Sequence, residues 1–303
     1  MDVVLLDGGM GQELVARSSR PASPLWSAYV MREEPEIVQA VHEDYLRAGA
    51  TVLTLNTYSS TPGRFASLAD PADFAPMQQR AIDLANAARD AVGVEATIAG
   101  CLPPLNGSYL PGNVRDFETN LAEYRRIVEA EADHVDVFMA ETMSTAEEGR
   151  AAAAAAADAG KPIWIAWTLA EKPAEDGTAR LRSGERVAEA LAAVDGLPVT
   201  GVLFNCCPPE MMTLGMPELA DDGRPYGGHA NGFTPIPETF VPGTTVDLLG
   251  KRKDLGPEAY AAHAKTWVGQ GATIVGGCCE VGPAHIAEMA STLQADGHRL
   301  VTA

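Results

Sequence analysis

Residues 34–60 decide the fold, and they read EPEIVQAVHEDYLRAGATVLTLNTYSS. Within this stretch, Glu36–Ala48 carries apolar residues at helical spacing and stops at Gly49, which predicts an amphipathic helix with a glycine at its end. The apolar run Thr51–Leu55 follows and gives way to polar residues, as a short buried strand does. A helix followed by a buried strand indicates one unit of an α/β fold with a parallel sheet.

The same alternation recurs along the whole chain. Eight apolar runs predict strands at Val3–Leu6, Thr51–Leu55, Thr97–Ala99, Val135–Ala140, Ile163–Trp167, Gly201–Phe204, Tyr226–His229 and Thr273–Val275. Helical composition lies between most of them, at Met77–Val92, Asn120–Ala132, Ala146–Ala159, Gly184–Ala193, Pro257–Val268 and Pro283–Gln294. Eight strands alternating with helices favour one closed (β/α)8 barrel, the TIM barrel, which at about 250 residues leaves room here for enlarged loops. We therefore expect a single domain over residues 1–303.

Two segments rich in proline, glycine or serine interrupt this alternation. They are Arg17–Arg32, after the first predicted strand, and Phe233–Lys253, after the seventh. Such composition is typical of loops rather than of helices or strands. We expect both to be enlarged loops of the barrel.

Composition excludes several function classes. The chain has 41 acidic and 22 basic side chains and a formal net charge of −19, which argues against nucleic-acid binding because phosphates require clustered Lys and Arg. No apolar run approaches the roughly 20 residues of a membrane-spanning helix, so we expect no membrane partner. The N-terminus lacks the basic segment and cleavage site of a secretory signal, and five cysteines are too few for a secreted disulfide framework in a chain of this length. We expect a cytoplasmic protein with reduced thiols.

Polar residues stand directly after the predicted strands, where a parallel barrel places its active site. These strand ends read DGGMG at 7–11, NTY at 56–58, GC at 100–101, ET at 141–142, NCC at 205–207, HAN at 229–231 and GGCCE at 276–280. Four of the five cysteines therefore follow the sixth and eighth strands, which lie two positions apart around a barrel. The strand ends are the candidate active site.

Thiolates are preferred ligands of zinc, and three of them leave one tetrahedral position open, as catalytic zinc sites do. We therefore expect Zn²⁺ as the cofactor. A metal site has two alternatives: cysteines also serve as small buried residues, and the neighbours Cys278 and Cys279 can pair, although only in a strained disulfide. Spacing alone does not choose between Cys206 and Cys207 as the ligand from the sixth strand.

Several of these segments, taken together, resemble the homocysteine S-methyltransferase family. This family includes the betaine- and S-methylmethionine-homocysteine methyltransferases and the homocysteine module of cobalamin-dependent methionine synthase. The matching segments are LLDGGMGQEL at 5–14, PLWSA at 24–28, the block 34–60, ETMS at 141–144, FNCC at 204–207 and GGCCE at 276–280. The pair FNCC and GGCC is the most specific, whereas DGGMG alone would be a weak signal.

The resemblance implies that Cys206, Cys278 and Cys279 hold the zinc. Cys207 is then not a ligand, and Cys101 is expected to pack. The resemblance also implies that Asp7, the Gly8 backbone and Glu141 bind the amino-acid part of homocysteine. Carboxylates accept hydrogen bonds from an ammonium group, and backbone N–H groups at a glycine turn can receive a carboxylate. The alternative for Asp7 is a turn residue or helix cap.

The other polar residues at the strand ends have less specific signals. Asn56, Thr57 and Asn205 can order the binding groups from behind, although Asn and Thr are also common turn residues. His229 can bind a metal, but with three cysteines available we expect it to form a hydrogen bond at the edge of the site.

Trp26 and Tyr58 lie in segments that follow the first two strands. An aromatic face attracts a sulfonium or quaternary ammonium group, so both residues are candidates for binding a methyl donor. The alternative is that they only anchor their loops.

The resemblance implies a zinc-dependent transfer of a methyl group from a small onium donor, of the S-methylmethionine, S-adenosylmethionine or betaine type, to the thiol of homocysteine, giving methionine. Its partners would be small molecules only. Two other functions fit a three-thiolate site: a lyase or hydrolase whose zinc activates water, and a non-catalytic metal-binding barrel. All-thiolate ligation argues against the first, and Asp7 and Glu141 argue against the second. The identity of the donor, the true acceptor thiol and the oligomeric state stay open.

Overall fold

The structure is a computed structural model that describes residues 1–21, 23–237 and 249–303. Its strands are β1 (Asp2–Leu5), β2 (Val52–Thr54), β3 (Thr97–Leu102), β4 (Val137–Met143), β5 (Ile163–Trp167), β6 (Val199–Asn205), β7 (Tyr226–Ala230), β8 (Ile274–Gly277) and β9 (Arg299–Leu300). Its α-helices are α1 (Met10–Arg17), α2 (Ser27–Glu33), α3 (Pro35–Arg47), α4 (Pro62–Leu68), α5 (Phe74–Val92), α6 (Phe117–Glu131), α7 (Ala146–Ala157), α8 (Val187–Ala193), α9 (Pro209–Ala220), α10 (Pro257–Gly269) and α11 (Pro283–Ala295). Short 3-10 helices η1 (Pro71–Asp73) and η2 (Pro111–Asn113) complete the set.

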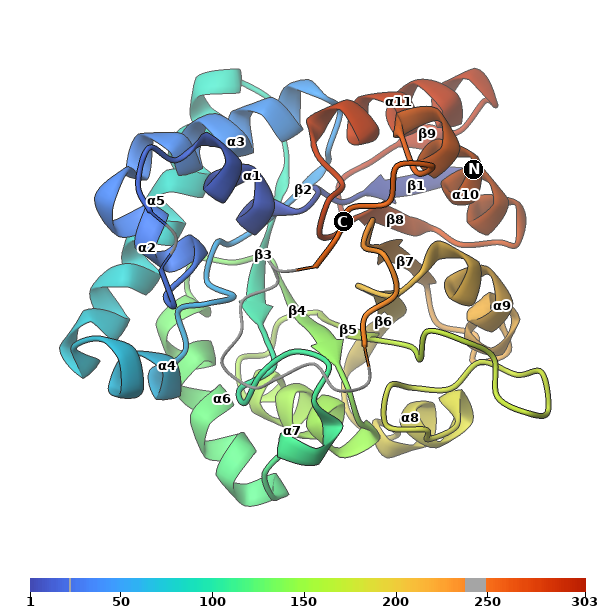
Figure 1. The fold of residues 1–303 in the computed structure, drawn as a ribbon, viewed down its shortest axis with the longest axis horizontal. Coiled ribbons are helices and arrows are strands. Elements are labelled where there is room, and N and C mark those ends of the chain that lie inside the picture. The colour runs from blue at the N-terminus through green and yellow to red at the C-terminus, as the bar shows by residue number, and fades with distance from the viewer. Residues whose placement is uncertain (22, 238–248) are drawn as a thin grey trace.

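The strands form one parallel sheet in the order β2-β3-β4-β5-β6-β7-β8-β1-β9. A parallel bridge between Leu6 and Val52 joins the end of β1 to β2, so the first eight strands close on themselves. Figure 1 shows the strands at the centre and the helices around them. The predicted TIM-barrel fold is confirmed.

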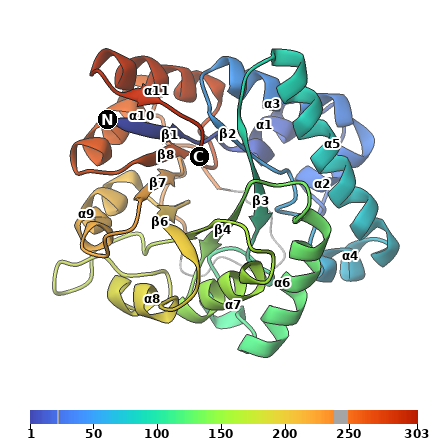
Figure 2. The ribbon, with the colours of Figure 1, turned by 180° about the vertical axis from the view of Figure 1, so that it is seen from behind.

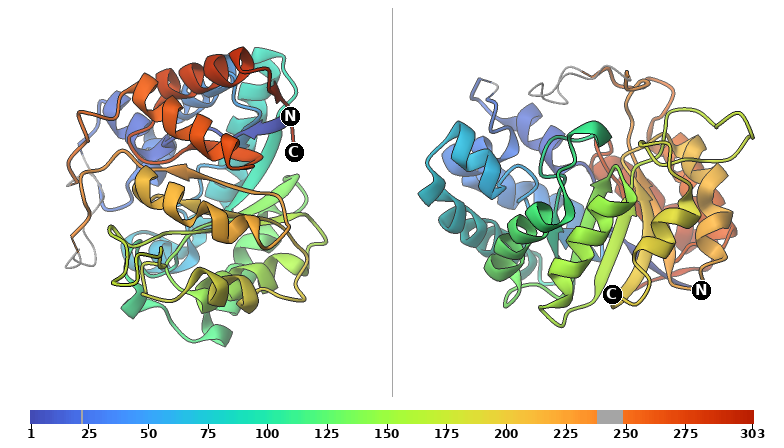
Figure 3. Two further views of the ribbon diagram at one scale, coloured as in Figure 1. Left: turned by 90° about the vertical axis from the view of Figure 1, so that its right-hand side faces the viewer. Right: turned by 90° about the horizontal axis from the view of Figure 1, so that it is seen from below.

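The short strand β9 was not predicted. It pairs with β1 through Asp2–Arg299 and Val3–Leu300, and the tail beyond it reaches β3, where the Ala303 N–H donates to Thr97 Oγ1 at 3.0 Å. The C-terminus therefore crosses the amino-terminal end of the barrel (Figure 2). Figure 3 shows both chain ends on the side of the barrel opposite the loops that follow β3 and β5.

Two apolar layers stabilise this architecture. One fills the barrel interior with residues from most of the strands, among them Val52, Met139 and Leu203. The larger layer lies between the sheet and the surrounding helices and includes the alanine tract of α7, which is helical as predicted. Side chains fill the barrel, so ligands have access only at its ends.

The structure contains helices that the sequence prediction missed. The segment Arg17–Arg32 is not purely a loop, because α2 occupies its C-terminal part; α1, α4 and α9 were also missed. The helices α1, α2 and α4 have 8, 7 and 7 residues and too few turns to display a periodic pattern. The 12-residue α9 contains Pro217 in its interior, which argues against a helix at the level of sequence. In the segment Phe233–Lys253, residues 238–248 lie outside the described residues, and Phe233 forms an isolated bridge with Lys251.

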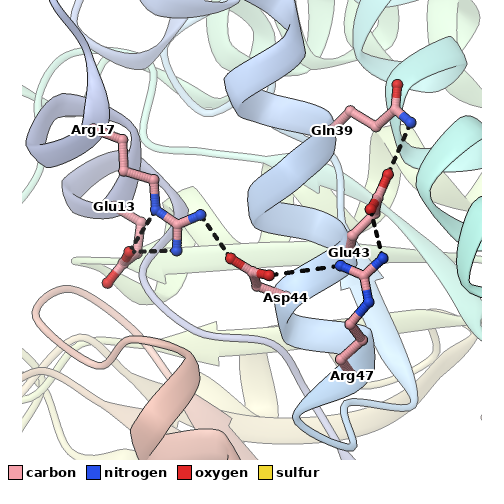
Figure 4. A network of polar contacts seen from close by, with 6 residues as sticks. All are labelled: Glu13, Arg17, Gln39, Glu43, Asp44 and Arg47. Carbon is pink, nitrogen blue, oxygen red and sulfur yellow. Dashed lines mark hydrogen bonds and ion pairs between the residues drawn. The ribbon is translucent and has the colours of Figure 1, made fainter.

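Polar contacts tie α1 to α3. Arg17 donates to Glu13 at 3.0 Å within α1 and to Asp44 of α3 at 2.7 Å, and Arg47 extends the network to Glu43 (Figure 4). Exposed ion pairs of this kind contribute about 0.2–1 kcal/mol each. The network orients α1, which begins immediately after the glycine turn that follows β1.

Among the helices of the described residues, none has the length and apolar character to cross a membrane.

Candidate active site

A cavity of about 490 Å³ opens at the carboxyl-terminal ends of the strands. Its wall includes most of the residues predicted from the strand ends: Asp7, Gly8, Trp26, Asn56, Tyr58, Glu141, Cys206, His229, Cys278 and Cys279. These residues come from β1, β2, β4, β6, β7 and β8, or from the loops that follow those strands. Thr57 and Asn205 do not contribute to this wall and lie behind it.

Three of the cysteines meet in the cavity wall. The sulfur atoms of Cys206, Cys278 and Cys279 all lie within 4.8 Å of one another, and those of Cys206 and Cys279 are 3.6 Å apart. Sulfurs bound tetrahedrally to zinc at about 2.3 Å are separated by about 3.8 Å, so this donor set fits such an ion. Cys207 packs into the hydrophobic core instead, where burial raises the pKa of its thiol. The structure thus brings Cys206, and not Cys207, to the other two thiols.

The backbone explains the separation of the two neighbours. Cys206 follows the last residue of β6 and has φ 49°, a left-handed conformation, and its N–H still donates to His229 O at 3.0 Å. Burial opposes ionisation of the Cys206 thiol, but hydrogen bonds from Cys278, Cys279 and Tyr109 bring its pKa well below its ordinary value. The protein itself therefore favours a thiolate at this position.

Tyr109 was not identified from the sequence. It lies in the loop after β3, is 3% exposed, and places its hydroxyl 2.9 Å from Cys206 Sγ. Burial raises the pKa of Tyr109 well above its ordinary value, so the hydroxyl keeps its proton and donates to the sulfur. Its position depends on a left-handed backbone, with φ 63°. The sequence GSYL at 107–110 offers only the residue type of Tyr109 as a signal for this contact with Cys206.

The carboxyl group of Asp7 is buried at the end of β1. It accepts hydrogen bonds from the Thr54 N–H at 2.9 Å and from Thr54 Oγ1 at 3.2 Å. Burial raises the pKa of Asp7 to about 7 in spite of these bonds. The adjacent Gly8 is required because a Cβ there would lie 2.1 Å from Val281 O. The glycine turn thus packs directly against the loop that follows β8.

Glu141 lies at the end of β4, on the cavity wall. Cys101 Sγ donates to its carboxyl at 3.1 Å, so Cys101 packs as predicted and also contacts this group. Burial raises the pKa of Glu141 to about 8. A carboxyl oxygen of Glu141, a ring nitrogen of His229 and Cys278 Sγ lie within 4.8 Å of one another. A cation bound here would stabilise the ionised carboxylate.

Asn205 positions the residue that follows Glu141. Its side chain accepts from the Thr142 N–H at 2.6 Å and donates to Thr142 Oγ1 at 2.9 Å. Thr142 has φ 60°, in the left-handed region. Asn205 therefore holds the end of β4 from the end of β6, across the intervening β5.

The two polar residues after β2 point in different directions. Asn56 lines the cavity, and its amide donates to Ser27 O at 3.4 Å, which connects it to the start of α2. Thr57 points away from the cavity and donates to Glu131 Oε1 at 2.8 Å. The structure therefore does not bring Thr57 to the other predicted site residues.

His229 is buried in the cavity wall. Burial lowers the pKa of its imidazole to about 4, so the ring is neutral near pH 7. Its Nε2 has no hydrogen-bond partner among the residues that the structure describes. A neutral imidazole in this position can exchange a hydrogen bond with a ligand.

Aromatic side chains also contribute to the wall. Trp26 and Tyr58 meet edge to face, with ring centroids 6.2 Å apart. Trp26 lies against Gly11, where a Cβ would approach its ring to 2.1 Å. Phe233 and Ile236, from the loop after β7, pack with Tyr109, Cys206 and Cys279 in a separate buried cluster. This cluster keeps water from one side of the sulfur atoms.

Comparison with known proteins points to one family. A family model described as homocysteine S-methyltransferase matches residues 4–293. The homocysteine S-methyltransferase of Escherichia coli K12 is 30% identical over 95% of this chain and 94% of its own, and YbgG of Bacillus subtilis, which carries the same description, is 27% identical over equal shares. The crystal structure of the E. coli homocysteine methyltransferase MmuM in a metallated form superposes with a TM-score of 0.79 and 28% identity, covering 96% of each chain.

Proposed function

Because the chain belongs to the homocysteine S-methyltransferase family, we propose that it transfers a methyl group from a small onium donor to homocysteine and so forms methionine. The observation that carries this proposal is the meeting of three cysteine sulfurs with two buried carboxyl groups in one cavity. Thiols can hold a metal that binds a further thiol, and the carboxyl groups can bind an ammonium group nearby.

Cys206, Cys278 and Cys279 would hold the metal, which we propose to be zinc. When bound, the zinc keeps the substrate sulfur deprotonated at neutral pH, where a free thiol of pKa about 8.5 is only a few per cent ionised. Tyr109 donates a hydrogen bond to Cys206 Sγ and so limits the negative charge on that ligand.

Asp7 and Glu141 would accept hydrogen bonds from the ammonium group of homocysteine, and the Gly8 backbone would face its carboxylate. Asn205 acts through Thr142 by holding the end of β4, and Asn56 connects the β2 loop to α2. Thr57 orders the wall from behind through Glu131. These contacts fix the amino-acid end of the substrate while its sulfur lies at the cysteines.

Trp26 and Tyr58 would bind the cationic end of the donor through their ring faces. In the transfer, a sulfur lone pair of homocysteine forms the new C–S bond, and the electrons of the broken bond stay on the donor heteroatom. No acid is required for the leaving group, because it departs neutral. Phe233 and Ile236 keep water from the sulfur atoms, which preserves their nucleophilicity.

The central experiment removes one ligand. Cys278→Ala should lose most of its bound zinc by elemental analysis, and methyl transfer should fall with it, while the circular dichroism spectrum is retained. Cys207→Ala is the matched control, because it removes a neighbouring thiol outside the group of three. Full zinc content and activity in Cys278→Ala would refute this metal site.

The donor is tested by turnover of homocysteine with S-methylmethionine, S-adenosylmethionine, betaine and dimethylsulfoniopropionate. Release of methionine from one of them, dependent on zinc, supports the proposal. Absence of transfer from all four, with hydrolysis or elimination instead, would favour a zinc-activated water.

We further propose that residues 1–303 act as one domain on small-molecule substrates in the cytoplasm. Free thiols as ligands require a reducing compartment.

A further inference from the structure

Arg64 contributes to the wall of the same cavity. It lies in α4, and its Nη2 donates to Pro24 O at 3.0 Å. Its Nε is buried and has no hydrogen-bond partner in the described part of the chain. No described carboxylate lies within ion-pair distance of this guanidinium.

A half-buried arginine with a buried Nε and without a carboxylate partner is unexpected in this chain, which has 41 acidic and only 22 basic side chains. Burial lowers the pKa of Arg64, which means that the surroundings disfavour its charge. The other arginine of the cavity wall, Arg115, is neutralised by an ion pair with Glu123. Buried charges are normally paired, so the guanidinium calls for an anion from a ligand.

The position of Arg64 places the site of this anion near the aromatic pair Trp26 and Tyr58. Its anchor, Pro24, is two residues from Trp26, and its helix follows the loop that carries Tyr58. Trp26 and Tyr58 are the residues proposed to bind the onium group. A guanidinium beside them binds a planar carboxylate in bidentate fashion.

We infer that Arg64 binds the carboxylate of the methyl donor while the onium group of the donor lies at Trp26 and Tyr58. This inference rests on the proposed function and adds to it the residue that recognises the carboxylate end of the donor. We assign the carboxylate of homocysteine to the Gly8 backbone and not to Arg64. The candidate ammonium acceptor Glu141 lies within 4.8 Å of Cys278 Sγ, so the amino-acid end of homocysteine belongs next to the thiol site.

The test compares a donor with and without its carboxylate. S-methylmethionine and (3-aminopropyl)dimethylsulfonium differ only in that group. The native protein should prefer S-methylmethionine by about 10- to 100-fold in kcat/KM, the range for hydrogen bonds to a charged group. Arg64→Met should abolish this preference by lowering kcat/KM for S-methylmethionine alone, and Arg64→Lys should restore part of it. Arg115→Met is the matched control and should retain the preference.

Two outcomes would overturn the inference. If Arg64→Met lowers kcat/KM equally for both sulfonium compounds, the residue only anchors the loop at Pro24. If it raises the KM of homocysteine and leaves the donor preference intact, the carboxylate belongs to homocysteine.

Calorimetric binding of the two sulfonium compounds separates this inference from the proposed function. Tighter binding of the carboxylate form, lost in Arg64→Met, supports the role of Arg64 even if no methyl transfer occurs. Equal binding of both compounds to the native protein refutes it.

Discussion

Asp7 and Glu141 are the two buried carboxyl groups in the cavity wall, and both have raised pKa values, about 7 and about 8. A group in this state gains from a cation, since the cation offsets the cost of its ionisation. Substrate binding and ionisation of these residues are therefore coupled. Replacing the carboxyl group of Glu141 with an amide tests this coupling at one residue.

Glu141→Gln should weaken homocysteine binding by about 1.5–3 kcal/mol, because it removes a charged hydrogen-bond acceptor and keeps the shape. Ionising the native Glu141 at pH 7 costs about 1.4 kcal/mol per pKa unit, so the loss should fall in the lower part of this range. Titration calorimetry of the zinc-loaded protein measures it. An unchanged dissociation constant would remove Glu141 from the binding site.

Trp26→Ala should lower the affinity for the donor by up to about 30-fold and leave homocysteine binding nearly unchanged, because a desolvated cation–π contact contributes up to about 2 kcal/mol. Since Trp26 also packs over Gly11, Trp26→Phe serves as the control that keeps an aromatic ring. Separate binding titrations of donor and homocysteine give the two affinities. Equal losses for both ligands would show that the tryptophan only supports its loop.

At the scale of the elements, the ends of β4 and β6 depend on each other. The left-handed backbone of Thr142 is a strained conformation costing about 1–3 kcal/mol, and Asn205 holds it with two hydrogen bonds. Strands that are not neighbours in the sheet are thereby connected at the level of the cavity. Glu141 precedes Thr142 directly, so its orientation depends on this connection.

Asn205→Ala should lower the free energy of unfolding by about 1–3 kcal/mol, because it leaves the buried Thr142 N–H without its acceptor. Homocysteine affinity should fall as well, since the end of β4 is no longer held. Chemical denaturation and binding titration give the two values. Thr142→Ser, which keeps the backbone N–H and the hydroxyl, should behave like the native protein; native-like binding by Asn205→Ala would contradict the connection.

At the scale of the whole molecule, buried acids make stability depend on pH. Glu131 of α6 is fully buried and accepts from Thr57 Oγ1 at 2.8 Å and from the Cys101 N–H at 3.0 Å. Burial raises its pKa from an ordinary 4.5 to about 8. The folded protein thus keeps this proton up to about pH 8, whereas the unfolded chain loses it near pH 4.5. The stabilisation is complete below pH 4.5 and is lost as the pH rises to about 8.

Glu131→Gln does not titrate; its amide oxygen can accept from the Cys101 N–H, and its NH2 can donate to Thr57 Oγ1, so the partners stay hydrogen-bonded. Its thermal unfolding midpoint should therefore fall less than that of the native protein between about pH 5 and pH 8. Asp7, Glu141 and Glu148, which also have raised pKa values, are present in both proteins. The difference between the two slopes of unfolding midpoint against pH therefore isolates the contribution of Glu131. Identical slopes would show that Glu131 does not carry a buried proton.

The sequence by itself determined the barrel, the strand ends and the cysteines among which we propose the metal ligands. These features depend on local patterns: apolar runs of strand length, helical spacing, and polar residues directly after each run. The residues Asp7, Glu141 and Cys278 were identified because each follows a buried strand, and the end of a barrel strand leads to one shared cavity.

Residue types and spacing left open which of two neighbouring side chains points into that cavity; the family resemblance favoured Cys206, and the tertiary structure gives the physical reason. Cys206 and Cys207 are adjacent and follow β6 directly. The left-handed backbone of Cys206 turns the chain at this point, with one sulfur in the cavity wall and the other in the core. Thr57 points to Glu131, while Tyr109 and Arg64 reach the cavity from a loop and a short helix that show no periodic pattern. Such directions follow from backbone angles and long-range packing, which residue types and their spacing do not encode.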